Sequence, residues 1–256
     1  MSVFRSVLCL GIAAGLSTCA QQLFEVASIK PANPETRGYS LVSTPGGKVV
    51  GANMSLKLLI AEAYHVPDFL VFGGPSWIES EKFDLNASAG RETKPGELRV
   101  MLQALLADRF ALKIRHEQKE LPVYVMTKAK KGDAWGPELH SADAGDCANK
   151  KSCGGLSVSN RSRIFGQKAP IEQLPEMLRW IMGRPVIDET GLKGLFDIDL
   201  NWTPDQSQAR SSDAPKETDG PSIFTAMQEQ LGIRLESRKR SIDVLIAEHA
   251  EKPSAN

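Results

Sequence analysis

The feature that most constrains this fold is a repeat within the chain. Residues 107–125 align with residues 228–246 without a gap. Apolar residues fall on apolar residues: Phe110 on Leu231, Leu112 on Ile233, Ile114 on Leu235, Leu121 on Ile242 and Val123 on Val244. Charged stretches also align in the middle of the match. Two α+β segments can look alike by chance, but a gapless match of this length favours duplication.

The likeness continues upstream of this match. Phe83-Asp-Leu85 is echoed by Phe196-Asp-Ile198, and a predicted helix over 55–64 is echoed by one over 171–182. Each half therefore reads as helix, strand, helix, strand, strand, with extra strands in front. The last two strands of the first half, 111–116 and 122–127, are predicted to form a hairpin around a charged turn. We predict an α+β fold of two tandem, pseudo-symmetric copies of this motif.

Apolar periodicity and turn residues locate the other elements. Ser55 is a suitable N-cap for the first helix, and a second helix is predicted over 95–109 with Pro95 in its first turn. Alternating apolar residues predict strands at 24–31 and 82–87. The first helix is predicted from four apolar residues at i, i+3, i+4 and i+7, which share one helical face: Leu56, Leu59, Ile60 and Ala63.

The N-terminus has the three parts of a secretory signal peptide, predicted over residues 1–20. Arg5 supplies positive charge, an apolar run extends from Val7 to Leu16, and small residues follow up to Ala20. The run is too short to span a bilayer as a helix, which needs about 20 residues. Cleavage after Ala20 is favoured, with lipidation at Cys19 as the alternative, and no transmembrane span is expected after signal removal.

Two cysteines outside the signal lie five residues apart in a polar loop. We predict a disulfide between Cys147 and Cys153, because an exported chain is oxidised and no histidine that could help to hold a metal lies between or beside them. The predicted organisation has a first repeat over 21–130 and a linker loop over 131–155. The second repeat follows over 156–256 and contains a mobile loop at 204–220.

Charge and motifs exclude several function classes. Lysine plus arginine equals aspartate plus glutamate, 31 each, so nothing favours nucleic acid as a partner. The chain lacks a nucleophile elbow, a phosphate-binding loop and a zinc-protease motif. Its four histidines are scattered singly, so we predict no catalytic residue, metal site or cofactor.

Some side chains can be interpreted as either functional or structural. Asp84 and Asp197 occupy matching repeat positions and could do acid–base work, but each lies in a predicted strand, where a structural role is favoured. Trp77, Trp180 and Trp202 could line a binding groove, and packing in the core is favoured for each.

Several motifs in combination resemble those of a soil-associated acidobacterial family of secreted proteins of unknown function. They are Phe24-Glu-Val-Ala-Ser-Ile-Lys-Pro31, Gly73-Gly-Pro-Ser-Trp77, Leu105-Leu-Ala-Asp-Arg-Phe110, Pro122-Val-Tyr124, Gly183-Arg-Pro-Val-Ile-Asp-Glu-Thr-Gly191 and Glu251-Lys-Pro-Ser-Ala-Asn256. The resemblance implies export, and relatives of the domain can be fused to membrane-bound sensor peptidases of the antibiotic-receptor type. It implies no catalytic residues. Ala247-Glu248 departs from the Ile-Asp-like pair that family members tend to have near the last strand.

We therefore expect an exported, non-catalytic binding or sensory module of the bacterial cell envelope, periplasmic or secreted, whose partner is an envelope protein or peptide. The alternative is an extracytoplasmic hydrolase with an unrecognised site. Its best candidates are Asp84, Arg109, His116 and Asp188, which would have to converge in one pocket.

Intact mass of protein from its host, measured with and without reduction, tests the predicted processing. We expect a chain starting at Gln21 that gains about two mass units on reduction, because a disulfide takes up two hydrogens. A chain starting at Cys19 with added lipid would contradict soluble export. An unchanged mass on reduction would contradict the disulfide.

Overall fold

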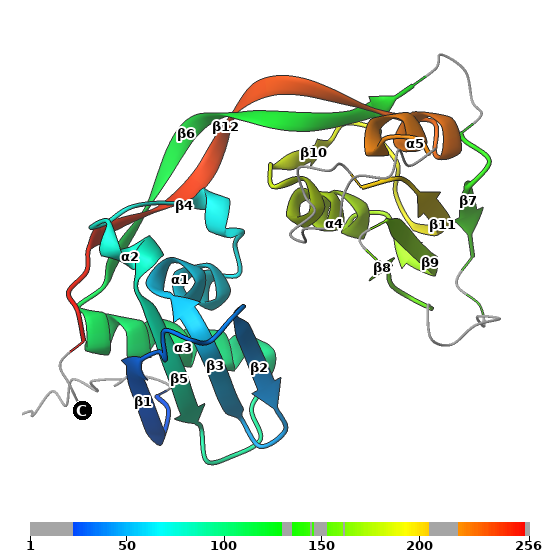
Figure 1. The fold of residues 1–256 in the computed structure, drawn as a ribbon. Helices are drawn as coiled ribbons and strands as arrows, with labels where there is room; N and C mark the ends of the chain where they lie inside the picture. Colours follow the sequence, from blue (N-terminus) through cyan, green and yellow to red (C-terminus); the bar gives the residue numbers. More distant parts are fainter. Residues whose placement is uncertain are drawn as a thin grey trace, which may run out of the picture.

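A computed structural model describes residues 23–129, 135–143, 145, 153–160, 162–204 and 220–253. These residues form five α-helices and three mostly antiparallel four-stranded sheets, so the chain is an α+β protein, as predicted. Figure 1 shows two lobes of helix and sheet joined by a pair of long strands. The predicted signal peptide, Cys147 and residues 205–219 lie outside the described residues.

The first lobe packs two helices on one face of an antiparallel sheet with strand order β1-β5-β3-β2. Inward-facing Leu85 meets Leu59 and Phe110 of the helices, and all three are fully buried in one core. A short helix α2 (Trp77–Ser80) and a 3-10 turn (Asp68–Leu70) complete the lobe. The main elements are β1 (Val26–Pro31), β2 (Ser40–Thr44), β3 (Lys48–Ser55), α1 (Leu56–Tyr64), β5 (Lys82–Ser88) and α3 (Pro95–Phe110).

Local signals set the ends of these helices. The Ser55 side chain accepts a hydrogen bond from the backbone N–H of Leu58 at 3.2 Å and caps α1. His65 ends α1 in the left-handed conformation, and Pro95 occupies the first turn of α3. The predicted helices over 55–64 and 95–109 and the strands around them are confirmed.

The second lobe has a similar arrangement around a separate core. Its antiparallel sheet has the order β7-β11-β9-β8, and two helices cover one face. Ile164 and Ile198 of the sheet meet Leu174, Leu178 and Met227 of the helices. The elements are β7 (Leu139–Ala142), β8 (Ser157–Ser159), β9 (Arg163–Pro170), α4 (Gln173–Met182), β11 (Leu195–Asn201) and α5 (Ile223–Gln230).

Two long antiparallel strands connect the lobes, β6 (Lys113–Lys128) and β12 (Ile233–His249). Each receives one short parallel strand at its C-terminal part: β10 (Val186–Asp188) joins β6, and β4 (Val71–Gly73) joins β12. Strand β12 contributes Ile233 to the second core and Leu245 to the first. The pair of strands therefore belongs to both lobes, as Figure 1 shows.

The predicted hairpin over 111–116 and 122–127 is wrong, since residues 113–127 all belong to the single strand β6. The second half likewise ends in one strand, β12, so the helix-strand-helix-strand-strand motif has one long strand where two were predicted. The physical reason lies in the charged stretch 117–120, which contains none of the glycine, asparagine or proline that tight turns need. Its side chains are charged because the middle of the ribbon is exposed.

The predicted linker loop 131–155 also needs correction. It contains β7, an edge strand that pairs with β11, and an isolated bridge between Cys153 and Gln167. The short Leu139–Ala142 segment has too few residues for its alternation to be recognised. The Cys147–Cys153 disulfide stays a prediction, because Cys147 lies outside the described residues.

Proline substitution in the middle of β6 tests the continuous strand. Lys119 pairs with Ile242 and Glu120 with Ser241. Because alternate residues of an antiparallel pair exchange hydrogen bonds, only one of these two donates to β12. We expect one of Lys119→Pro and Glu120→Pro to lower the free energy of unfolding by about 1–3 kcal/mol more than the other. Chemical denaturation measures this, with the two alanine variants as controls; equal tolerance of both prolines would contradict a continuous strand.

Candidate functional site

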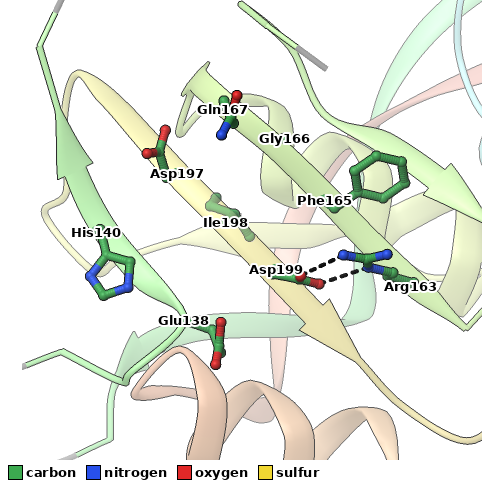
Figure 2. A pocket seen from close by; sticks show the side chains of 9 residues that line it. All are labelled: Glu138, His140, Arg163, Phe165, Gly166, Gln167, Asp197, Ile198 and Asp199. Atoms are coloured by element: carbon green, nitrogen blue, oxygen red, sulfur yellow. Dashed lines mark hydrogen bonds and ion pairs between the residues drawn. The ribbon is translucent and has the colours of Figure 1, made fainter. Parts of the chain in front are cut away.

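The candidate site is a cavity of about 360 Å³ on the outer face of the β7-β11-β9-β8 sheet, away from the helices. Mostly polar side chains from three strands or their ends surround it, together with the ring of Phe165, as Figure 2 shows. They are Glu138 and His140 at β7, Arg163, Phe165 and Gln167 on β9, and Asp197 and Asp199 on β11. Strand pairing thus gathers residues that lie far apart in the sequence.

Strand alternation explains why these side chains share one face. On β11, Phe196, Ile198 and Leu200 are buried against the helices, so Asp197 and Asp199 point to the other side. On β9, buried Ile164 alternates with Arg163 and Phe165. The apolar alternation needed for the core therefore fixes the orientation of the polar residues.

Arg163 and Asp199 form the most ordered contact of the site. The Nε atom of Arg163 donates to Oδ1 of Asp199 at 2.8 Å, and a second guanidinium nitrogen donates to Oδ2. Asn201 adds a hydrogen bond to the same carboxylate at 2.9 Å. The guanidinium carbon also lies 4.8 Å from the centre of the Phe165 ring. This two-point contact fixes the guanidinium, so a ligand would meet a preorganised side chain.

The pair also sets the ionisation of its two members. The hydrogen bond from Arg163 holds the pKa of Asp199 below its usual value, and the same bond raises the pKa of Arg163. Asp199 is therefore a carboxylate across the neutral pH range. Both side chains are partly exposed, so the pair contributes about 1 kcal/mol or less to stability.

Asp197 has a structural task beside this pair. Its Oδ1 accepts the backbone N–H of Lys168 at 2.8 Å, and Lys168 has a left-handed backbone with φ of 50°. The register between β11 and β9 shifts at this point, which marks a β-bulge. Asp197 thus satisfies a donor that the bulge withdraws from the sheet.

Asp84 does the same in the first lobe. Its Oδ1 accepts the backbone N–H of Asn53 at 2.9 Å, and Asn53 has a φ of 55° at a register shift between β3 and β5. The matching Phe-Asp-Leu and Phe-Asp-Ile motifs therefore supply matching bulge acceptors. These contacts support the structural reading of the two aspartates.

The structure does not bring the four hydrolase candidates together. Asp84 lies on β5, and Arg109 at the end of α3 lines a different cavity, near the N-terminal strand. His116, on the ribbon, contacts Asp243 at 2.8 Å. Asp188, at the end of β10, accepts the backbone N–H of Thr190 at 2.8 Å. The four candidates therefore lie on four different elements: β5, α3, β6 and β10.

The three tryptophans have different positions. Trp77 stacks on Phe110 in the first core, and Trp202 is buried in the second, so the preference for core packing is confirmed for both. Trp180 is instead 50% exposed on α4. Among the residues of the site on the outer sheet face, only Asp197 was a candidate from the sequence. The alternation of Arg163, Phe165 and Gln167 can be seen in the sequence and indicates that they share one face of a strand. The sequence does not indicate that β9 pairs with β11.

The described part of the chain has neither a metal-binding cluster nor a membrane-spanning helix. No group of three or more histidine, cysteine, aspartate or glutamate side chains is placed there to hold a metal ion. None of its helices combines the length and the apolar character needed to cross a bilayer.

Replacing the bulge acceptors tests their structural role. We expect Asp197→Ala and Asp84→Ala each to lower the free energy of unfolding by about 1–3 kcal/mol, because a backbone donor loses its acceptor. Asp→Asn at the same positions keeps an acceptor oxygen, so it should restore most of the loss in chemical denaturation. Asparagine variants as unstable as the alanine variants would contradict this role.

Comparison with known proteins gives a family and no function. No curated protein and no solved structure was found to match the chain. A family model described as "Protein of unknown function (DUF3738)" matches residues 57–250, which extend from α1 to the end of β12 and so include the helices of both lobes and the ribbon. The chain belongs to the DUF3738 family.

Proposed function

We propose that this protein is an exported binding or sensory module of the bacterial cell envelope that holds its ligand on the outer face of the β7-β11-β9-β8 sheet. The observation that carries this proposal is the cavity of about 360 Å³ with its fixed Arg163–Asp199 pair. The helices cover the opposite face of this sheet, so its polar face is left for a ligand.

The chemistry of the cavity favours a ligand rich in hydroxyl groups. Glu138, Asp197 and Asp199 offer carboxylate oxygens that accept hydrogen bonds, whereas Arg163 and Gln167 carry N–H groups that donate them. Three carboxylates disfavour an anion, and the polar lining disfavours an apolar molecule. A saccharide of the envelope both donates and accepts, and it can lay an apolar ring face on Phe165.

Binding fits the two aspartates better than acid–base catalysis. Asp199 is tied to Arg163, and its lowered pKa keeps it from giving up a proton near neutral pH. Asp197 is occupied by the N–H of Lys168. The alternative, a hydrolase, would require one of these groups to leave its partner.

The proposal of export rests on the sequence. The N-terminal pattern over residues 1–20, the predicted Cys147–Cys153 disulfide and the resemblance to secreted acidobacterial proteins all favour a periplasmic or secreted protein. Lipid anchoring through Cys19 is the alternative.

We also propose that the two halves arose by duplication. The order β3-α1-β4-β5-α3-β6 in the first half is followed by β9-α4-β10-β11-α5-β12 in the second. The short strands support this proposal, since β10 pairs with Tyr124–Met126 and β4 with Leu245–Ala247, which are aligned residues of the repeat. The two halves then differ in their outer faces: Lys48 begins β3 opposite Ser88, whereas Arg163 lies near the start of β9 opposite Asn201.

Calorimetric titration with soluble glycan strands from the host envelope tests the proposed function. We expect the full chain to bind them and Arg163→Ala to weaken binding about tenfold, which corresponds to about 1.4 kcal/mol. His140→Ala, which changes an exposed side chain of the same cavity, should also weaken binding. Lys48→Ala, at the related position of the first lobe, is the matched control and should bind as the wild type does.

Two results would contradict the proposal. Equal affinity of the wild type and both cavity variants would place the ligand elsewhere. Recovery of shortened glycans after incubation, measured by mass spectrometry, would show hydrolysis and favour the alternative.

A further inference from the structure

A second cavity, of about 350 Å³, lies where the end of α4, the start of α5 and strand β6 meet. It is separate from the outer sheet face, because its residues come from the helix side of the second lobe and from the ribbon. Six of its lining side chains are apolar or aromatic: Tyr124, Ile181, Met182, Trp202, Ile223 and Phe224.

An aromatic pair forms one wall of this cavity. The rings of Tyr124 and Phe224 lie 5.3 Å apart with an angle of 68° between their planes, an edge-to-face contact. Phe224 is nevertheless 41% exposed, whereas Trp202 in the same cavity is buried. The cavity therefore has an apolar floor and an aromatic wall that remains open to an incoming molecule.

The positively charged side chain of Arg184 lies beside this aromatic wall. Arg184 comes after Gly183, the C-cap of α4, and its guanidinium carbon lies 4.6 Å from the centre of the Tyr124 ring. The chain is fixed there, because the N–H of Tyr124 donates to the carbonyl of Pro185 at 2.9 Å. Arg184 is thus held next to the cavity by the backbone as well as by stacking.

Arg184 differs from three other arginines of this lobe and of the ribbon beside it, each of which pairs with a carboxylate. Arg163 pairs with Asp199, and Arg238 and Arg240 both pair with Glu189. For Arg184 the described residues provide only a long contact of 3.5 Å from a guanidinium nitrogen to the hydroxyl of Ser237, and no carboxylate. A guanidinium without a carboxylate partner favours binding of an anionic group. A carboxylate fits best, because its two oxygens can accept two parallel N–H hydrogen bonds from the guanidinium.

We propose that this cavity binds a molecule or chain end that carries a carboxylate next to an apolar group. The carboxylate pairs with Arg184, and the apolar group enters the cavity beside Phe224 and Met182. A free organic acid and the C-terminus of a peptide share this chemistry. The inference does not depend on the proposed saccharide site, because the two cavities share no lining residue.

Titration calorimetry on the full chain tests the proposal with two pairs of probes. N-acetylphenylalanine stands for a peptide end and octanoate for a free acid, and the amide of each probe removes the charge while keeping the shape. We expect at least one acid to bind about tenfold or more tightly than its amide, because a charged hydrogen-bonded pair with Arg184 is lost in the amide. Binding of only one acid identifies the source of the carboxylate.

Variants locate the binding. Arg184→Met should remove the preference for the acid over its amide, and Arg184→Lys should restore part of it. Phe224→Ala should weaken acid and amide alike, and it is expected to fold because Phe224 is partly exposed. Trp180→Ala, an exposed aromatic on the same helix α4 outside the cavity, is the control and should bind normally.

The proposal is overturned if neither acid binds, if acids and amides bind equally, or if Arg184→Met keeps the preference for the acid. Failure of glycan binding in the separate titration would leave this result unaffected.

Discussion

The pairing of β6 with β12 is the constraint on which the rest of the structure depends. Hydrogen bonds between these strands run from Lys113–His249 at one end to Lys128–Ile233 at the other. The two ends of β12 enter different cores, with Ile233 in the second and Leu245 in the first. Each lobe therefore needs a strand that also serves the other, which makes the two lobes one structural unit even though their cores are separate.

The bulge carboxylates show how one motif serves the same structural task in both lobes. Asp84 and Asp197 each accept a backbone N–H from a residue in the left-handed conformation. A bulge increases local twist and redirects the neighbouring side chains of its strand. In the second lobe the strand so bent carries Arg163, Phe165 and Gln167, the β9 wall of the candidate cavity. The structural aspartate thus helps to shape the face on which we place the ligand.

The two cavities of the second lobe differ in chemistry, and the difference follows from their place in the layers. The outer sheet face is mostly polar because the alternation of the strands sends most apolar side chains inward, with Phe165 as an exception in the cavity. The second cavity lies where helix ends and the ribbon meet, so it is lined by side chains that complete the edge of the core. One lobe can therefore offer a hydrogen-bonding surface and an apolar pocket with an adjacent arginine.

The sequence by itself determined the α+β class, the first helices with their Ser55 and Pro95 signals, and the two Phe-Asp strands, because periodicity and capping are local properties. Tertiary structure decided the rest. From the sequence alone, the exposed charged stretch 117–120 is interpreted as a turn. Its pairing with β12 shows that it is the middle of a strand. Arg163 and Asp199 lie 36 residues apart, and only the register of β9 on β11 brings them together. The alternation of each strand limits its possible registers, but which strands pair is decided by contacts between residues far apart in the sequence.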